Sequence, residues 1–312
     1  MIGLDEVRAA RARIAPFVRR TPNLVPSQAK DPLPDGGVTL KLECLQVTGS
    51  FKARGAMNRL LGTPKEALSA GIVTASGGNH GLAVARTAHV AGVPATVFLP
   101  SNVSPPKVEK LKGWGARIEI VGDVWDAANE AALEHARRTG AVYFHPFSDP
   151  LVVAGQGTLG LDILDETPEV DTVLVAIGGG GLIAGVAAAM KALRPGIRIV
   201  GIEPEGSPTL HACLAAGEVV TLPQVTTIVP TMACRRTDEA IFDLVRRHVE
   251  EIVLVSDESM REAARWLWFE CGIAADLSGA AAIAALRSGR IALPAEAKVC
   301  AIVCGAGPDG IG

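Results

Sequence analysis

The stretch that decides the fold is residues 172–186, which read TVLVAIGGGGLIAGV. Residues 172–177 form an apolar, β-branched run of strand length, and an apolar helical pattern begins directly after the four glycines. A strand, a glycine turn and a helix in this order are typical of α/β proteins with parallel sheets. Glycines let backbone N–H groups approach an anion, and the start of a helix carries partial positive charge. This segment therefore predicts a phosphate site.

Strands and helices alternate along most of the remaining chain. The predicted strands are 38–42, 71–75, 94–99, 116–121, 172–177, 197–202, 251–255 and 298–304. The predicted helices between them are 53–61, 80–90, 125–138, 182–193, 258–270 and 279–286. The units fall into two groups, so we predict an α/β fold of two lobes, each a mostly parallel sheet flanked by helices. We assign residues 1–48 and 145–312 to a large domain and residues 49–144 to a small one.

The composition of the 312 residues excludes several classes of protein. A net charge of −3 without a basic stripe argues against a nucleic-acid partner. The apolar runs are too short to span a bilayer, and residues 1–18 read as an amphipathic helix rather than a signal peptide. The six scattered cysteines lack zinc-ligand spacing and suit a reducing compartment. We therefore expect a cytoplasmic protein without a structural metal.

The glycine run alone leaves its ligand open. No Lys-Ser or Lys-Thr pair follows it, so it is not a P-loop. The pattern Gly179-x-Gly181-x-x-Ala184, with Glu203 closing the next strand, mimics the fingerprint of dinucleotide-binding proteins. A nicotinamide-dependent dehydrogenase is therefore one alternative, and a tight turn without a ligand is another.

A lysine supplies the second chemical signal. Residues 48–56 read TGSFKARGA, which places Lys52 where a loop meets the predicted helix 53–61. The helix dipole at that position disfavours a protonated amine, which helps a lysine act as a nucleophile. Phe51 can pack beside a planar ring. Pyridoxal phosphate requires an amine for its aldehyde and backbone N–H groups for its phosphate, and Lys52 and the glycine run supply both. Lys52 taken alone could also be a solvated surface lysine.

Two further segments end predicted strands and carry polar groups. Residues 74–81 read TASGGNHG, where Ser76 and the loop N–H groups can hold a carboxylate and Asn79 can donate to a phenolate oxygen. A capped helix start would explain the same residues. Cys304 ends the last strand, where it is an uncharged partner for a pyridine nitrogen or an ordinary buried cysteine.

Together these four segments resemble the serine/threonine dehydratase (threonine ammonia-lyase) family of fold-type-II, tryptophan synthase β-like, pyridoxal-phosphate enzymes. The resemblance covers nearly the whole chain. It extends to Arg20-Thr21-Pro22, Lys41-Leu42-Glu43, His145-Pro146-Phe147, Ala154-Gly155-Gln156-Gly157-Thr158 and Gly201-Ile202-Glu203-Pro204.

The resemblance implies the cofactor, the reaction and the residues that serve them. Lys52 would bond to the cofactor aldehyde and later move the Cα proton of a β-hydroxy amino acid, L-threonine or L-serine. β-Elimination of that substrate would give a 2-oxo acid and ammonia. The implied cofactor-binding residues are Phe51, Lys52, Asn79, Gly178, Gly179, Gly180, Gly181, Leu182 and Cys304. The implied carboxylate-binding residues are Ser76, Gly77, Gly78, Asn79 and His80. The family also implies a homodimer.

Three departures from the family pattern limit the expectation. Gly77 stands where eukaryotic serine racemases have an acid/base serine, so efficient racemisation is not expected. The family's divalent-cation ligands correspond here to Glu203, Ser207 and Thr209, and we expect no dedicated metal, with Glu203 only a weak candidate. The segments 276–279 and 228–231 also differ from the usual motifs, so another β-substituted amino acid is an alternative substrate.

Other functions remain open at this point. A racemase or a β-replacement enzyme could use the same scaffold, and a non-catalytic amino-acid-binding protein would be a different class. Because the sequence stops soon after Cys304, feedback inhibition by isoleucine through a C-terminal effector domain is not expected.

Overall fold

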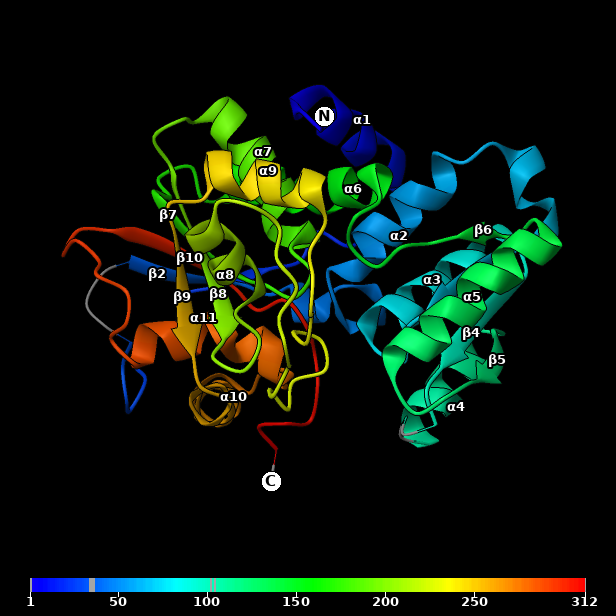
Figure 1. Cartoon of the computed structure of the whole chain (residues 1–312). Coiled ribbons are helices and arrows are strands. Elements are labelled where there is room, and N and C mark those ends of the chain that lie inside the picture. The colour runs from blue at the N-terminus through cyan, green and yellow to red at the C-terminus, as the bar shows by residue number, and fades with distance from the viewer. Residues whose placement is uncertain (1, 34–36, 102, 104, 312) are drawn as a thin grey trace.

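The computed structural model describes residues 2–33, 37–101, 103 and 105–311. Within these residues the strands form one six-stranded and one four-stranded sheet (Figure 1). The larger sheet runs in the order β1 (Asn23–Leu24), β2 (Gly37–Lys41), β10 (Lys298–Ile302), β7 (Thr172–Ala176), β8 (Arg198–Pro204) and β9 (Glu251–Val255). The smaller sheet runs β5 (Arg117–Ile120), β4 (Ala95–Leu99), β3 (Ile72–Ala75) and β6 (Val142–Tyr143). Apart from β1 against β2, the neighbouring strands in this described part are parallel.

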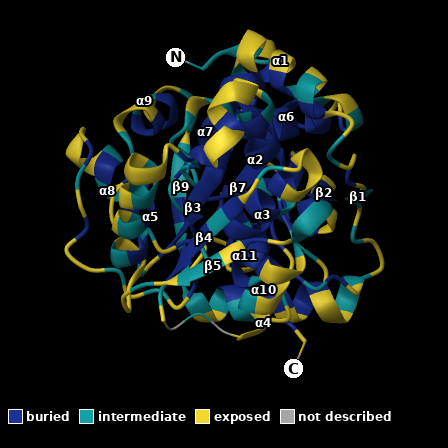
Figure 2. Ribbon diagram, turned by 90° about the vertical axis from the view of Figure 1, so that its right-hand side faces the viewer, coloured by how far each residue is buried: buried dark blue, intermediate teal, exposed yellow. Residues whose placement is uncertain are grey.

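The larger sheet is covered by helices on both faces. Figure 1 shows α6 (Pro150–Glu166), α7 (Gly181–Leu193) and α9 (Glu239–His248) on one side and α10 (Asp257–Cys271) and α11 (Leu277–Arg287) on the other. Every residue of β7 is buried, as expected for a central parallel strand that lacks a solvent face. The remaining helices of this part are α1 (Leu4–Ile14) and α8 (Thr209–Ala216). Figure 2 shows the strands mostly in the dark blue of buried residues and α1 partly in yellow.

The smaller sheet divides its side chains between two helical layers. Ile72, Val97 and Leu99 pack in one apolar cluster with residues of α3 (Asn79–Ala91) and α4 (Pro105–Gly113). Val73 and Phe98, which are their neighbours in sequence, pack in another cluster with residues of α5 (Trp125–Thr139). Successive residues of a strand point to opposite faces, which accounts for this division. The helix α2 (Lys52–Leu61) packs between α3 and α6.

The predicted α/β fold with two helix-flanked, mostly parallel sheets is confirmed. The predicted helix 1–18 corresponds to α1, and Met1 lies outside the described residues. The chain passes from the larger sheet to the smaller one between β2 and β3 and returns between β6 and β7. The domain boundaries at 48/49 and 144/145 remain a prediction.

The sequence pattern does not predict the helix α6, although residues 154–158 within it match a motif of the family. Glycines at 155, 157 and 160 weaken the helical pattern. They are needed because α6 packs very closely on α2 and α7. A Cβ on Gly155 would lie 2.7 Å from the Cα of Gly55, and one on Gly157 would lie 2.8 Å from the carbonyl oxygen of Gly185. The Asp149 N-cap with Pro150 at the first helical position was the signal that could have located this helix.

Candidate active site

Lys52 is the first residue of α2, as the sequence predicts for a loop-to-helix junction. Its Nζ donates to the carbonyl oxygen of Pro146 at 2.7 Å and lies 5.1 Å from the centre of the Phe51 ring. Burial lowers the pKa of the Lys52 amine to about 8, against a smaller opposing effect of the Cys304 and Cys234 thiols. The side chain is therefore held in place and is much closer to its neutral, nucleophilic form than an exposed lysine.

Two histidines near Lys52 are kept neutral. Burial, with a contribution from the Lys52 charge, lowers the pKa of His80 to about 3 and that of His145 to about 4. His145 Nδ1 accepts hydrogen bonds from the backbone N–H groups of Phe147 and Ser148 at 3.2 and 3.0 Å, so the proton of its neutral ring is on Nε2. Neither ring adds a positive charge beside the lysine at neutral pH.

The glycine run joins β7 to α7 without room for side chains. A Cβ on Gly178 would lie 2.6 Å from the Thr231 carbonyl oxygen, and one on Gly179 would lie 2.2 Å from a carbon of the Phe147 ring. Gly180 has a φ of +93°, a left-handed conformation that favours glycine. Among the described residues, the N–H groups of residues 178–181 donate to no other group of the chain. These N–H groups at the start of α7 form a cradle that fits a phosphate.

The loop 76–78 and the start of α3 follow β3. The hydroxyl of Ser76 accepts from the N–H of Gly78 at 3.3 Å, which tightens the turn. A Cβ on Gly81 would lie 1.9 Å from the Ser76 carbonyl oxygen, so the turn requires glycine there. The imidazole of His80 is buried, with Nε2 3.0 Å from the Phe144 carbonyl oxygen. The His80 side chain is thus turned into the protein, whereas Ser76 and Asn79 are only partly buried.

The end of β10 brings Cys304 to the lysine loop. The N–H of Phe51 donates to the Cys304 carbonyl oxygen at 3.2 Å, and Ser50 pairs with Gly305 in an antiparallel bridge. Burial raises the pKa of the Cys304 thiol, so the group stays protonated and uncharged. Its Sγ lies 3.8 Å from the hydroxyl of Ser278. The structure therefore presents a neutral thiol beside Lys52.

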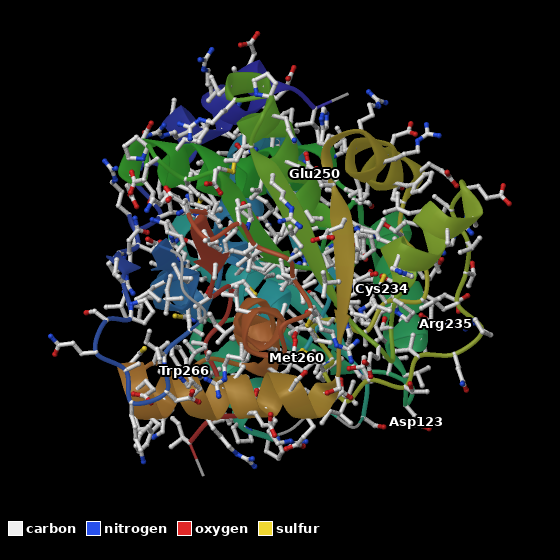
Figure 3. All side chains as sticks on the ribbon, turned by 90° about the vertical axis from the view of Figure 1, so that its left-hand side faces the viewer. Asp123, Cys234, Arg235, Glu250, Met260 and Trp266 are labelled. Atoms are coloured by element: carbon white, nitrogen blue, oxygen red, sulfur yellow. The ribbon has the colours of Figure 1, made fainter. Side chains whose placement is uncertain are left out.

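Two residues near the site were not among the predicted site residues. Cys234 lies between α8 and α9, next to Arg235 (Figure 3), and its thiol is close enough to Lys52 for each to affect the pKa of the other. Asp276 is the N-cap of α11, and its Oδ2 accepts from Asn79 Nδ2 at 2.9 Å. The position of Asp276 could have been predicted from the sequence, because an aspartate directly before a helical pattern predicts an N-cap. The position of Cys234 near Lys52 could not have been predicted, because a lone cysteine in a loop predicts no contact.

A buried ionic network supports α2 directly behind Lys52. Arg54 is 1% exposed, and its guanidinium pairs with both oxygens of Glu43 at 2.8 Å. It also donates to Asp162 Oδ2 at 2.7 Å and to the Thr158 hydroxyl at 3.1 Å. The neighbouring guanidinium holds the pKa of the Glu43 carboxyl below its usual value despite burial. The bidentate pair fixes the first turn of α2 to the 3-10 turn Glu43–Leu45 that follows β2, and the bonds to Asp162 and Thr158 fix it to α6.

The donors around Glu203 do not fit a divalent cation. Glu203 is fully buried, and its two oxygens accept from the N–H groups of Leu210 and His211 at 2.8 and 2.9 Å. The hydroxyl of Thr209 donates to the Cys234 carbonyl instead of supplying a negative charge. Calcium takes about six to eight oxygen ligands, several of them carboxylate. Glu203 acts here as an acceptor for the start of α8.

Comparison with known proteins assigns the family. The family model described as pyridoxal-phosphate dependent enzyme matches residues 14–305. The chain belongs to the pyridoxal-phosphate dependent enzymes. This membership selects pyridoxal phosphate over the nicotinamide alternative for the glycine run. The amine of Lys52 and the N–H cradle after β7 fit that cofactor's aldehyde and phosphate.

The named relatives include threonine ammonia-lyases and serine racemases. The chain is 37% identical over 307 residues to the L-threonine ammonia-lyase of Thermotoga maritima, covering 98% of this chain and 76% of that protein. It is 38% identical over 286 residues to the serine racemase of Oryza sativa subsp. indica, covering 91% of this chain and 84% of that protein. The structure of the processed form of threonine deaminase isoform 2 from Solanum lycopersicum matches with a TM-score of 0.91 at 30% identity, covering 97% of this chain and 83% of that one. The predicted resemblance to the serine/threonine dehydratase family is confirmed.

No helix among the described residues is long and apolar enough to cross a membrane.

Proposed function

We propose that the chain is an ammonia-lyase that removes the β-hydroxyl and the amine of L-threonine or L-serine, giving a 2-oxo acid and ammonia. The observation that carries this proposal is the convergence of a weakly basic Lys52 at the start of α2 with a glycine cradle and a neutral Cys304 that follow two neighbouring parallel strands, β7 and β10. The relatives named L-threonine ammonia-lyase support the substrate class.

We assign the residues that hold the cofactor by their chemistry. When bound, pyridoxal phosphate supplies an aldehyde for amines and a conjugated ring that stabilises negative charge at Cα. The N–H groups of Gly178, Gly179, Gly180, Gly181 and Leu182 would hold its phosphate, with Lys52 at the aldehyde. Phe51 would lie beside the ring, Asn79 at the ring oxygen and Cys304 at the ring nitrogen. A neutral thiol does not enforce a positive ring nitrogen, which favours prompt departure of the β-hydroxyl.

The proton chemistry falls to Lys52. With a pKa of about 8, its amine can accept the Cα proton near neutral pH and release it again. Before the cofactor binds, the Pro146 carbonyl oxygen holds Lys52 Nζ in place through a hydrogen bond. Loss of the hydroxyl as water leaves an unsaturated amine, and water then displaces ammonia to give the oxo acid. The N–H groups of the loop 76–78, with the backbone of His80, would bind the substrate carboxylate, and the Gly78 N–H would exchange its 3.3 Å bond to the Ser76 hydroxyl for this contact. The His80 ring is turned away.

A racemase is the second candidate, because relatives named serine racemase match at 38% identity. Local packing argues against a second proton-transfer group at position 77. A Cβ on Gly77 would lie 2.9 Å from Val103 Cγ2 and 3.3 Å from Leu99 Cδ2. Formation of D-serine from L-serine without oxo acid would favour this candidate.

The test is a panel of β-hydroxy amino acids given to the reconstituted protein, scored for oxo acid, ammonia and the enantiomer of the remaining substrate. We expect oxo acid and ammonia in equal amounts without an added thiol, and a requirement for a thiol would indicate β-replacement. Lys52→Ala should lose the visible chromophore and all turnover, whereas Lys65→Ala, at an exposed position, should keep both. Retention of both by Lys52→Ala would remove that residue from the mechanism.

We further propose that the enzyme is a cytoplasmic homodimer. Light scattering of the purified protein tests the dimer, and fractionation of the source cells tests the compartment.

A further inference from the structure

One hydrogen bond joins the start of α3, which carries the proposed ring contact Asn79, to the start of α11. Asn79 is the first residue of α3, beside the smaller sheet, and Asp276 caps α11, beside the larger one. Asn79 Nδ2 donates to Asp276 Oδ2 at 2.9 Å, although the two residues are 197 positions apart. The bond therefore fixes one part of the proposed site relative to the other.

The carboxylate of Asp276 has little freedom to move. Its Oδ1 accepts from the Ser278 hydroxyl and from the Gly279 N–H, both at 2.6 Å. This leaves Oδ2 for Asn79. The backbone is also tied down, because the Asp276 N–H donates to the Gly305 carbonyl oxygen at 3.0 Å.

Glycines after β10 allow this arrangement. A Cβ on Gly305 would lie 2.5 Å from Asp276 Oδ2 and 2.9 Å from Asn79 Nδ2. A Cβ on Gly307 would lie 2.7 Å from the Asp276 Cβ. The segment that follows Cys304 thus closes directly over the Asp276–Asn79 pair, so any larger residue at 305 would separate the two side chains.

The chemistry of the pair determines the direction of the amide. An ionised carboxylate only accepts hydrogen bonds, whereas an amide offers a donor end and an acceptor end. Burial raises the pKa of Asp276, but both of its oxygens act as acceptors, Oδ1 from Ser278 and Gly279 and Oδ2 from Asn79, so Asp276 selects the nitrogen end of Asn79. That nitrogen carries two hydrogens, and Asp276 takes one of them. The second N–H is left to donate elsewhere.

We propose that Asp276 is a positioning residue, whose carboxylate orients the Asn79 amide so that its second N–H donates to the ring oxygen of pyridoxal phosphate. The inference rests on the cofactor placement given under the proposed function. It assigns to Asp276 an effect on the cofactor that acts only through Asn79.

Asp276→Asn tests this because it changes the chemistry with little change in shape. Its oxygen can still accept from Ser278 and Gly279, but an amino group would then replace Oδ2 and oppose the amino group of Asn79. The Asn79 amide would have to turn, presenting its oxygen to the ring oxygen. We expect a loss of cofactor affinity of about tenfold, which corresponds to roughly 1.4 kcal/mol, and a changed absorption spectrum of the bound cofactor.

A double-mutant cycle with Asn79→Ala separates positioning from a direct effect. If Asp276 acts through Asn79, Asp276→Asn should have almost no further effect on affinity or spectrum once Asn79 is alanine. Asp309→Asn is the matched control. Asp309 Oδ2 accepts from the Leu277 N–H at 3.0 Å, so it caps the same helix start, but the hydrogen bond from Asn79 goes to Asp276. It should leave the spectrum unchanged.

The exchanged pair Asn79→Asp with Asp276→Asn distinguishes positioning from a merely structural role. The exchange restores a donor and an acceptor between the helices, so thermal stability should recover relative to Asn79→Asp alone. Cofactor affinity and spectrum should not recover, because an oxygen would face the ring oxygen. Recovery of both would overturn the inference, and so would an equal effect of Asp276→Asn with and without Asn79.

These measurements use the cofactor without substrate, so they do not depend on which amino acid is turned over. If wild-type protein fails to bind pyridoxal phosphate, the proposed function and this inference fall together. If wild type turns over L-threonine but the cycle is additive, only the inference about Asp276 fails.

Discussion

The rate at which pyridoxal phosphate bonds to Lys52 is expected to follow the fraction of this lysine that is neutral. Burial lowers the pKa of Lys52 to about 8 from 10.5. At pH 7, an amine with the lowered pKa is neutral in about one molecule in ten, but an ordinary lysine in only about one in 3,000. The fold therefore increases the reactive form roughly 300-fold.

The assay mixes cofactor-free protein with excess pyridoxal phosphate in a stopped-flow instrument and follows the visible chromophore from about pH 6 to about pH 10.5, a range that spans both the lowered and the ordinary lysine pKa. We expect the rate to rise about tenfold per pH unit below pH 8 and to level off above it. A small primary amine measured in parallel corrects for titration of the cofactor itself. A rate that keeps rising to about pH 10, with no break near pH 8, would show that Lys52 is a solvated ammonium and would refute the reasoning.

Three further outcomes test the supporting structure. Replacing Arg54 by Met removes the guanidinium partner of the buried Glu43 carboxylate and should lower the free energy of unfolding by about 3–5 kcal/mol in urea titrations, and a loss below about 1 kcal/mol would contradict the network's role. Gly179→Ala should abolish tight cofactor binding measured by absorbance, because the new Cβ would lie 2.2 Å from the Phe147 ring. In the control Gly196→Ala the new Cβ has no atom within 4 Å, and this variant should bind the cofactor normally. Burial raises the pKa of Glu203 from 4.5 to about 7, so the folded state binds the extra proton and stability should fall as pH rises from 4.5 to 7. Glu203→Gln should flatten that decline in thermal melts, and an unchanged slope would place the titration elsewhere.

Local sequence patterns predicted an element correctly where neighbouring residues alone determine its structure. The run 172–177 is apolar throughout because β7 is buried on both faces, and this made the parallel sheet predictable. The pattern failed for α6, where Gly155 and Gly157 serve contacts with α2 and α7 rather than the helix itself. Close packing between distant helices cannot be seen in the periodicity of one of them.

By itself the sequence determined the α/β class, the family and the positions of Lys52 and the glycine run, because each depends on residue order within a short segment. Only the tertiary structure shows that the Lys52 amine donates to the Pro146 carbonyl oxygen, 94 positions away, and that burial lowers the pKa of Lys52 toward neutrality. It also decided that Asp276 meets Asn79 across 197 positions. Burial and the direction of a hydrogen bond depend on which distant segments the fold brings together, and no local pattern records that.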